Sequence, residues 1–375
     1  MPRIIQWADG LGYDEIARML VDKGTYGLQT LRPPGYPTVM AAVYAAFGKS
    51  LLTLRVVEAI LGTIAVGLIG LIGSRWFGHR AGLLAATLAA LHPLLAFLPS
   101  SQYSENVAVL AITLVLWTAF AAYQSGRWWQ WAVAGALCGA TTLIRPNVVT
   151  MFIGLAIGFA VVFLHERRNW LPPLVITACA LILTVAPWIV RNHQVHDRWY
   201  FISSGGGRQF WFGNNPWTTG ATSVLPQPDS AMSAHLLQLP NEFAQERYLY
   251  RKGVEFIREQ PGRAARLYLV KLANLFALYP ETLSRRFENR WSQGVQAVAS
   301  IVIFAGALLG LSRARNTPAA WPLIGAVTGF ALVNALFFGG LRYRMVIEPC
   351  LLLMAGLGWA TVWERVFKRP TSKRC

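Results

Sequence analysis

The residues nearest the start of the chain combine a carboxylate with an arginine in a way that could serve group transfer. Asp9 stands in Asp9-Gly-Leu-Gly-Tyr13, and Arg32 opens Arg32-Pro-Pro-Gly-Tyr36, just before the first long apolar run. A carboxylate can accept a proton from an attacking hydroxyl, and an arginine fork can hold two oxygens of a phosphate. We therefore predict that Asp9 is a general base and that Tyr13, Arg32 and Tyr36 bind substrate beside it.

Further polar residues stand where later apolar runs end. Ionisable groups so close to a hydrocarbon core are costly and usually functional. An arginine at such a place can also be a headgroup anchor, and Glu105 can equally be the structural partner of one of the arginines. The predicted members of a lipid-phosphate site are Glu105, Arg145, Arg191, Asn192, Arg342, Tyr343 and Arg344.

The composition is that of a polytopic membrane protein. Hydrophobic residues make up 54% of the 375 and charged residues only 14%, which excludes an ordinary soluble domain with about a quarter of its residues charged. The net charge of +17 is spread between apolar runs, which favours membrane lipids over nucleic acid as partners. Apolar runs lie at about 51–74, 81–98, 106–123, 129–145, 148–164, 171–190, 296–312, 319–338 and 346–363.

The predicted fold is an all-α polytopic membrane protein with about nine transmembrane helices, juxtamembrane helices and one long extracytoplasmic loop. We expect short helices at 13–23 and 33–47. In the long loop we expect a strand-like segment at 199–212 and helices at 241–259 and 263–279. The expected divisions are a catalytic loop with juxtamembrane helices at 1–50, transmembrane helices at 51–190, the long loop at 191–295, transmembrane helices at 296–363 and a basic cytoplasmic tail at 364–375.

Positive charge in the short connections predicts which side each loop faces. Basic residues lie on alternate connections, around Arg75, Arg127, Arg167 and Arg313, and in the tail. This side is cytoplasmic by the positive-inside rule, so the predicted site faces outward from a cytoplasmic (inner) membrane. The rule does not ask for arginine on the outer side, which favours a site over a set of anchors. Because an outward head without a preceding span is unusual, we expect a further span before Met1.

The motifs, taken together, resemble those of a known family. The chain is similar to the polytopic GT-C glycosyltransferases of the dolichyl-phosphate-mannose:protein mannosyltransferase (family 39) and aminoarabinose transferase type. The motifs that carry the resemblance, in order, are Asp9-Gly-x-x-Tyr13, Arg32-Pro-Pro-Gly-Tyr-Pro37, Ser104-Glu105, Arg145-Pro-Asn147, Pro187-Trp-Ile-Val-Arg-Asn192, Phe210-Trp-Phe-Gly-Asn-Asn215 and Arg342-Tyr-Arg344.

This resemblance implies a polyprenyl-phosphate-linked sugar as donor, an acceptor on the non-cytoplasmic side and a catalytic carboxylate in the first outer loop. Asp9 is the position that matches this carboxylate. Many relatives have an Asp-Glu pair where this chain has Asp9-Gly10. Any role of the second acid is therefore vacant or moved to Asp14 or Glu15.

The expected reaction is transfer of the sugar, with inversion, to an acceptor protein or glycan. No sequence pattern demands a cofactor, and a divalent cation is compatible with the site. A transporter or flippase for an anionic lipid or solute is one alternative, although paired broken helices near mid-membrane are not evident. A non-catalytic lipid-binding subunit is the other, favoured by the vacant second acid.

Overall fold

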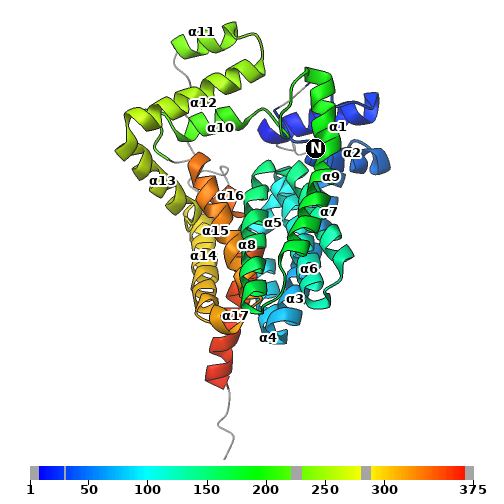
Figure 1. Cartoon of the computed structure of the whole chain (residues 1–375), viewed down its shortest axis with the longest axis vertical. Helices are drawn as coiled ribbons and strands as arrows, with labels where there is room; N and C mark the ends of the chain where they lie inside the picture. Colours follow the sequence, from blue (N-terminus) through cyan, green and yellow to red (C-terminus); the bar gives the residue numbers. More distant parts are fainter. Residues whose placement is uncertain (1–7, 29–30, 221–229, 280–288, 368–375) are drawn as a thin grey trace, which may run out of the picture.

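Helices account for every predicted apolar run (Figure 1). The computed structural model describes residues 8–28, 31–220, 230–279 and 289–367, with Asp9 described by its backbone alone. The helices of the bundle are α3 (Leu51–Phe77), α4 (His79–Ala90), α5 (Pro93–Phe97), η1 (Leu98–Ser100), α6 (Glu105–Ser125), α7 (Trp128–Ile144), η2 (Pro146–Val148), α8 (Val149–His165), α9 (Leu171–His196), α14 (Arg290–Leu311), η4 (Ala314–Asn316), α15 (Ala320–Phe337), α16 (Leu341–Arg344) and α17 (Glu348–Phe367).

Not every helix of the bundle is long and apolar enough to span a membrane. Among the described residues, six helices are long and apolar enough to cross a membrane. A seventh is obtained if α4 and the α5–η1 segment, bent by 51° relative to each other, form one span. The chain is thus an integral membrane protein, and the count of nine stays a prediction because α7 has only 17 residues and α17 has charged residues near both ends.

The predicted juxtamembrane helices are confirmed and one local prediction is wrong. The head forms α1 (Ala8–Lys23) and α2 (Gly35–Phe47), and the long loop forms α11 (Ser230–Gln238), α12 (Glu242–Glu259) and α13 (Pro261–Leu275). The segment predicted to be strand-like instead contains the helix α10 (Gly206–Gly213). Its aromatic residues favour a strand, but the described residues include no strand to pair with, and a helix satisfies the backbone locally.

The elements outside the bundle gather at one of its ends. Figure 1 shows α1, α2 and α10–α13 beyond one end of the bundle, whereas α17 reaches the opposite end. The segments predicted to share one side of the membrane therefore do lie on one side of the protein.

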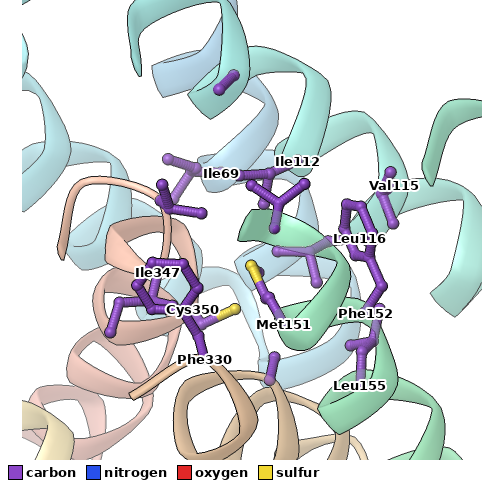
Figure 2. Packing of buried hydrophobic residues seen from close by; sticks show 14 of the residues in the cluster. Ile69, Ile112, Val115, Leu116, Met151, Phe152, Leu155, Phe330, Ile347 and Cys350 are labelled. Carbon is purple, nitrogen blue, oxygen red and sulfur yellow. The ribbon is translucent and has the colours of Figure 1, made fainter. Parts of the chain in front are cut away.

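The interior of the bundle is closed by apolar side chains from several helices. Figure 2 shows Ile69, Ile112, Met151, Phe330 and Cys350, which come from α3, α6, α8, α15 and α17 and are all buried. Inside a bilayer such contacts stabilise through close packing more than through the hydrophobic effect, because lipid tails are equally apolar. This core fixes the ends of the helices that carry the polar residues.

A glycine contact between α8 and α15 gives a direct test of this packing. A Cβ atom on Gly154 would lie 2.0 Å from the carbonyl oxygen of Gly325. Gly154→Ala should therefore force the two backbones apart and lower the free energy of unfolding by about 1–3 kcal/mol. Thermal unfolding in detergent measures the change. Gly67→Ala, on an exposed face of α3 with nothing within 4 Å, should not destabilise the protein, and equal losses in both variants would contradict the contact.

Lys271 attaches the outer helices to the bundle. Its buried ammonium donates to the carbonyl oxygens of Gly213 (3.0 Å) and Leu336 (3.2 Å) and to Oδ1 of Asn214 (3.2 Å). Burial lowers the pKa of Lys271 to about 8, while three acceptors suit the protonated form. One side chain of α13 thus joins the end of α10 to the end of α15.

Lys271→Met should loosen this attachment. The change leaves buried acceptors without their donor, at about 1–3 kcal/mol each, so the free energy of unfolding should fall by about 2 kcal/mol or more. Protease cleavage within α10–α13 should become faster, as measured by limited proteolysis. Lys252→Met on α12 removes a half-exposed ion pair with Glu255 and should change stability by less than about 1 kcal/mol. Equal cleavage in the two variants would show that Lys271 does not hold the outer helices.

Candidate active site

The start of α1, Arg32 and the start of α2 form one side of the candidate site. The Tyr13 ring meets the Tyr36 ring edge-on, with centroids 5.0 Å apart. The Arg32 guanidinium carbon lies 4.6 Å from the Tyr13 ring centroid. Tyr36 donates a hydrogen bond of 2.5 Å to Glu58 of α3. Burial and the Glu58 carboxylate hold the pKa of Tyr36 well above its usual range, so its hydroxyl remains a donor.

Glu105 is the centre of the second side of the candidate site. It is the first residue of α6, is fully buried, and pairs with Arg145 Nη1 at 2.8 Å and with Arg342 Nε at 2.5 Å. The Arg342 guanidinium carbon lies 3.7 Å from the Tyr103 ring centroid, and its side chain keeps 24% of its exposure. Two cations thus pair with one buried carboxylate at the end of the bundle.

Arg145 is held from several directions. Its Nη1 also donates to Ser104 Oγ at 3.1 Å, and its guanidinium carbon lies 5.9 Å from the Tyr343 ring centroid. Its buried Nε has no hydrogen-bond partner. Tyr343 is itself stacked on Phe338, with centroids 5.4 Å apart. The structure therefore brings four predicted residues, Glu105, Arg145, Arg342 and Tyr343, into one group.

Two close contacts of glycine backbone join the two sides of the candidate site. Gly35, at the start of α2, is so close to α7 that an added Cβ would lie 2.7 Å from the backbone nitrogen of Ile144, next to Arg145. A Cβ on Gly10 would lie 3.1 Å from Gln102, the residue before Tyr103. The backbone of Asp9 therefore begins α1 beside the group that holds Arg342. The side chain of Asp9 lies outside the described residues.

Arg344 belongs to a different cluster, although it is only two residues from Arg342. Its guanidinium is fully buried, pairs with Glu348 at 3.1 Å, and donates to Ser300 Oγ (3.1 Å) and to the carbonyl oxygen of Ala277 (2.8 Å). Glu348 also bonds to His92 Nε2 at 2.8 Å. This network joins α5, α14, α16 and α17 within the protein.

Arg191 and Asn192 also lie apart from Glu105. Arg191 Nη2 donates to the carbonyl oxygen of Gly27 at 2.5 Å, and its guanidinium carbon lies 4.8 Å from the Trp188 ring centroid. Asn192 is fully buried and donates to the carbonyl oxygen of Ile202 at 3.5 Å. Arg191 thus joins the end of α9 to the turn that follows α1, beyond the helix end opposite Asp9, and Asn192 joins it to the segment before α10.

The residues suggested for a second acid differ in their surroundings. Asp14 is buried and accepts hydrogen bonds from Tyr44 at 2.5 Å and from Arg18 at 2.8 Å. Burial and the Asp14 carboxylate raise the pKa of Tyr44. Glu15, on the other side of α1, is exposed. Asp14 therefore holds α1 on α2, and neither residue reproduces a second acid next to Asp9.

Two polar residues of the site were not predicted. Glu58 stands within the first apolar run, where a buried carboxylate is itself a signal of function. Gln102 precedes Tyr103 in the turn between η1 and α6 and is fully buried. An uncharged residue in a polar turn gives no comparable signal in sequence.

Residues 31–190 match the family model described as dolichyl-phosphate-mannose-protein mannosyltransferase. This match includes Arg32, Tyr36, Glu105 and Arg145. The chain is also similar to the apo structure of the oligosaccharyltransferase from Archaeoglobus fulgidus, with a TM-score of 0.57 and 14% identity over 97% of this chain and 48% of that one. The chain has the GT-C fold. A search of curated proteins found no match.

Two further structures extend the comparison of this GT-C-like chain. The archaeal oligosaccharyltransferase in complex with an inhibitory peptide and a dolichol-phosphate gives a TM-score of 0.53 at 14% identity, over 97% of this chain and 47% of that one. ArnT from Cupriavidus metallidurans bound to undecaprenyl phosphate gives 0.44 at 16% identity, over 97% and 76%. The chain thus spans about half the length of the archaeal enzyme. The family match covers less than half of the chain, and the similar structures show the shared fold.

A metal ion has no evident set of ligands in the described part of this GT-C-like chain. A third structure of the archaeal enzyme is a complex with Zn and sulfate. Among the residues that the structure describes here, no three His, Cys, Asp or Glu side chains gather to hold a metal.

Proposed function

We propose that this protein transfers a sugar from a polyprenyl phosphate to a hydroxyl group of an acceptor protein or glycan. The observation that carries the proposal is the pair of arginines around Glu105. Arg145 and Arg342 both pair with this one buried carboxylate, and the Arg342 side chain keeps 24% of its exposure. Guanidinium groups at this end of the bundle suit an anionic phosphodiester, and a structure with this fold is a complex with a dolichol-phosphate.

The same charge favours the reaction as well as binding. In the proposed step the acceptor oxygen forms a bond to the anomeric carbon while the bond from that carbon to the phosphate oxygen breaks. The electron pair stays on the phosphate, whose charge goes from −1 towards −2. Fixed guanidinium groups therefore stabilise the transition state more than the ground state. Arginine suits this role because it stays charged in a dry site and its fork can hold two phosphate oxygens.

Asp9 is proposed to receive the proton of the acceptor hydroxyl. An alcohol has a pKa far above 7, so a carboxylate within hydrogen-bond reach lowers the barrier as the oxygen attacks. The neighbours of Asp9 support this assignment, since Gly10 contacts Gln102 and Gly12 contacts Arg32. Attack from the Asp9 side with departure towards Arg342 is a single displacement, which inverts the anomeric carbon.

A transporter or flippase fits the structure less well. Transporter sites lie near the bilayer midplane between discontinuous helices that recur in both halves of the chain. The described residues contain one bent helix pair, α4 with α5–η1, and not one in each half. The charged group around Glu105 lies at one end of the bundle instead.

The proposed site faces outward from the cytoplasmic (inner) membrane. The basic connections belong to the opposite end of the bundle, and the positive-inside rule predicts the cytoplasm there. Nucleotide sugars are cytoplasmic, so an outward site needs a donor that reaches it attached to a lipid.

Membranes containing the protein test the proposal directly. They are incubated with defined polyprenyl-phosphate sugars and a mixture of acceptor glycans and proteins, and the release of polyprenyl phosphate is measured. We expect release that exceeds the release from membranes lacking the protein, with at least one donor. Absence of release with all hexosyl and pentosyl donors, together with absence of binding to polyprenyl phosphate, would overturn the proposal.

A further inference from the structure

We propose that Gln102 binds a hydroxyl group of the sugar that the lipid donor carries. This inference rests on the proposed function and adds to it a residue that binds the sugar rather than the phosphate of the donor. It starts from a polar side chain that is fully buried and yet makes no hydrogen bond.

The burial and backbone conformation of Gln102 lower the stability of the folded protein. Its side chain is fully buried, and neither Oε1 nor Nε2 has a hydrogen-bond partner. A buried polar group left unpaired costs about 1–3 kcal/mol. The backbone is also in the left-handed region, with φ of 55°, which a residue with a Cβ rarely adopts. Unpaired groups and strained backbone of this kind concentrate at functional sites.

The position of Gln102 indicates which ligand it serves. The Arg342 guanidinium lies over the ring of Tyr103, the residue that follows Gln102. Gln102 is therefore next in sequence to a residue of the proposed phosphate site. On the other side Gln102 contacts Gly10, which follows Asp9. The transferred sugar must lie between the phosphate that leaves and the base that faces its anomeric carbon. Gln102 adjoins both places, through Tyr103 on one side and the backbone of Gly10 on the other.

The chemistry of an amide suits a sugar. Gln102 offers two N–H donors and one carbonyl acceptor, and a sugar hydroxyl can both donate and accept. The amide is neutral, so it neither competes with the arginines for phosphate nor repels it. A charged residue at this place would change the electrostatic balance set by Glu105, Arg145 and Arg342.

The backbone of Gly10, in the first turn of α1, lies against Gln102. Gly10 has no side chain to fill or bridge the space, and an added Cβ would already be 3.1 Å from Gln102 Oε1. The described side-chain contacts of α1 with the rest of the protein begin further along, with Tyr13 against Tyr36 and Asp14 against Tyr44. Because Gln102 is fully buried, binding of a sugar to the amide requires a displacement of this turn.

Gln102→Met tests the inference because methionine keeps the length of glutamine but removes its polar atoms. If the amide is kept unpaired for a ligand, removing it should relieve the burial cost and raise the melting temperature by a few degrees. The affinity for a polyprenyl-phosphate sugar should fall about tenfold, with a matching loss of transfer. The affinity for polyprenyl phosphate without a sugar should stay within twofold of the wild type.

Gln296→Met is the matched control. Gln296 in α14 is equally buried and its Oε1 also has no hydrogen-bond partner, but its Nε2 donates a 3.1 Å hydrogen bond to Ser300 Oγ. Its replacement should lower the melting temperature and leave the affinities for both lipids unchanged. A lower melting temperature for Gln102→Met with unchanged affinity for the sugar donor would show a purely structural role and overturn the inference.

A second variant keeps the test decisive if Gln102→Met does not fold. Gln102→Glu keeps the shape and polarity of the side chain but places a negative charge beside the donor phosphate. Affinity for the sugar donor and for polyprenyl phosphate should both fall at least tenfold, and unchanged affinities would overturn the inference. Failure of the wild type to bind either lipid would instead contradict the proposed function itself.

Discussion

Asp9→Asn is expected to reduce sugar transfer by a factor of about 100 to 10,000 while the protein stays folded. Asparagine keeps the shape of aspartate but cannot accept the proton of the attacking hydroxyl. The affinity for polyprenyl phosphate should not fall, because the cations around Glu105 are unchanged. The measurement is the initial rate of polyprenyl phosphate release at saturating donor, together with direct binding of the unglycosylated lipid.

The control lies on the same helix. Asp22, near the other end of α1, is exposed and pairs with Lys49, so Asp22→Asn makes the same chemical change away from the proposed site. It should retain the wild-type rate. A wild-type rate in Asp9→Asn would remove Asp9 from the mechanism, and the exposed Glu15 would then be the next carboxylate of α1 to replace, because Asp14 is bonded to Tyr44 and Arg18.

The helices could be predicted from sequence because the bilayer leaves the backbone few choices. A segment in hydrocarbon must satisfy its peptide groups internally, so a long apolar run becomes a helix. The segment at 199–212 lies outside the apolar runs, where that constraint is absent. There the prediction of a strand-like segment was wrong, since local preference gives way to the available partners, here the helix α12 beside α10.

Only part of the site could be predicted from the sequence in this way. Charge at the ends of apolar runs pointed to Arg342 and Arg344 equally, but these residues are two positions apart in the short helix α16. At about 100° per residue they point in directions about 200° apart, so Arg342 reaches Glu105 while Arg344 reaches Glu348. A helix of four residues has no apolar periodicity from which its orientation can be predicted.

Other parts of the site depend on contacts between distant segments. Tyr36 and Glu58 are 22 residues apart, and Glu105 and Arg342 are 237 apart. No local pattern relates such pairs. Gln102 shows the same limit, because its missing hydrogen bonds and left-handed backbone are properties of the folded chain.

Arg342→Met is expected to reduce donor kcat/KM by a factor of about 100 to 1,000, in line with the loss of about 2.7–4 kcal/mol of transition-state stabilisation. The substitution removes the partly exposed cation but leaves Glu105 paired with Arg145 at 2.8 Å. Glu105 is therefore not left as an unpaired buried charge, so the protein should remain folded. Affinity for polyprenyl phosphate without a sugar should fall as well, which distinguishes this variant from both Asp9→Asn and Gln102→Met.

Two further substitutions separate charge and geometry from general damage. Arg342→Lys keeps the cation but loses the planar fork, so its kcat/KM should lie between those of the wild type and the methionine variant. Arg168, in the connection after α8, also pairs with a carboxylate (Glu166, 3.1 Å) and lies over a tyrosine ring (Tyr123, 5.2 Å). That connection is at the opposite end of α8 from Arg145, so Arg168→Met should leave donor kinetics unchanged. If Arg342→Met kept the wild-type affinity for polyprenyl phosphate, the charge around Glu105 would stabilise only the fold, and the phosphate would have to bind elsewhere.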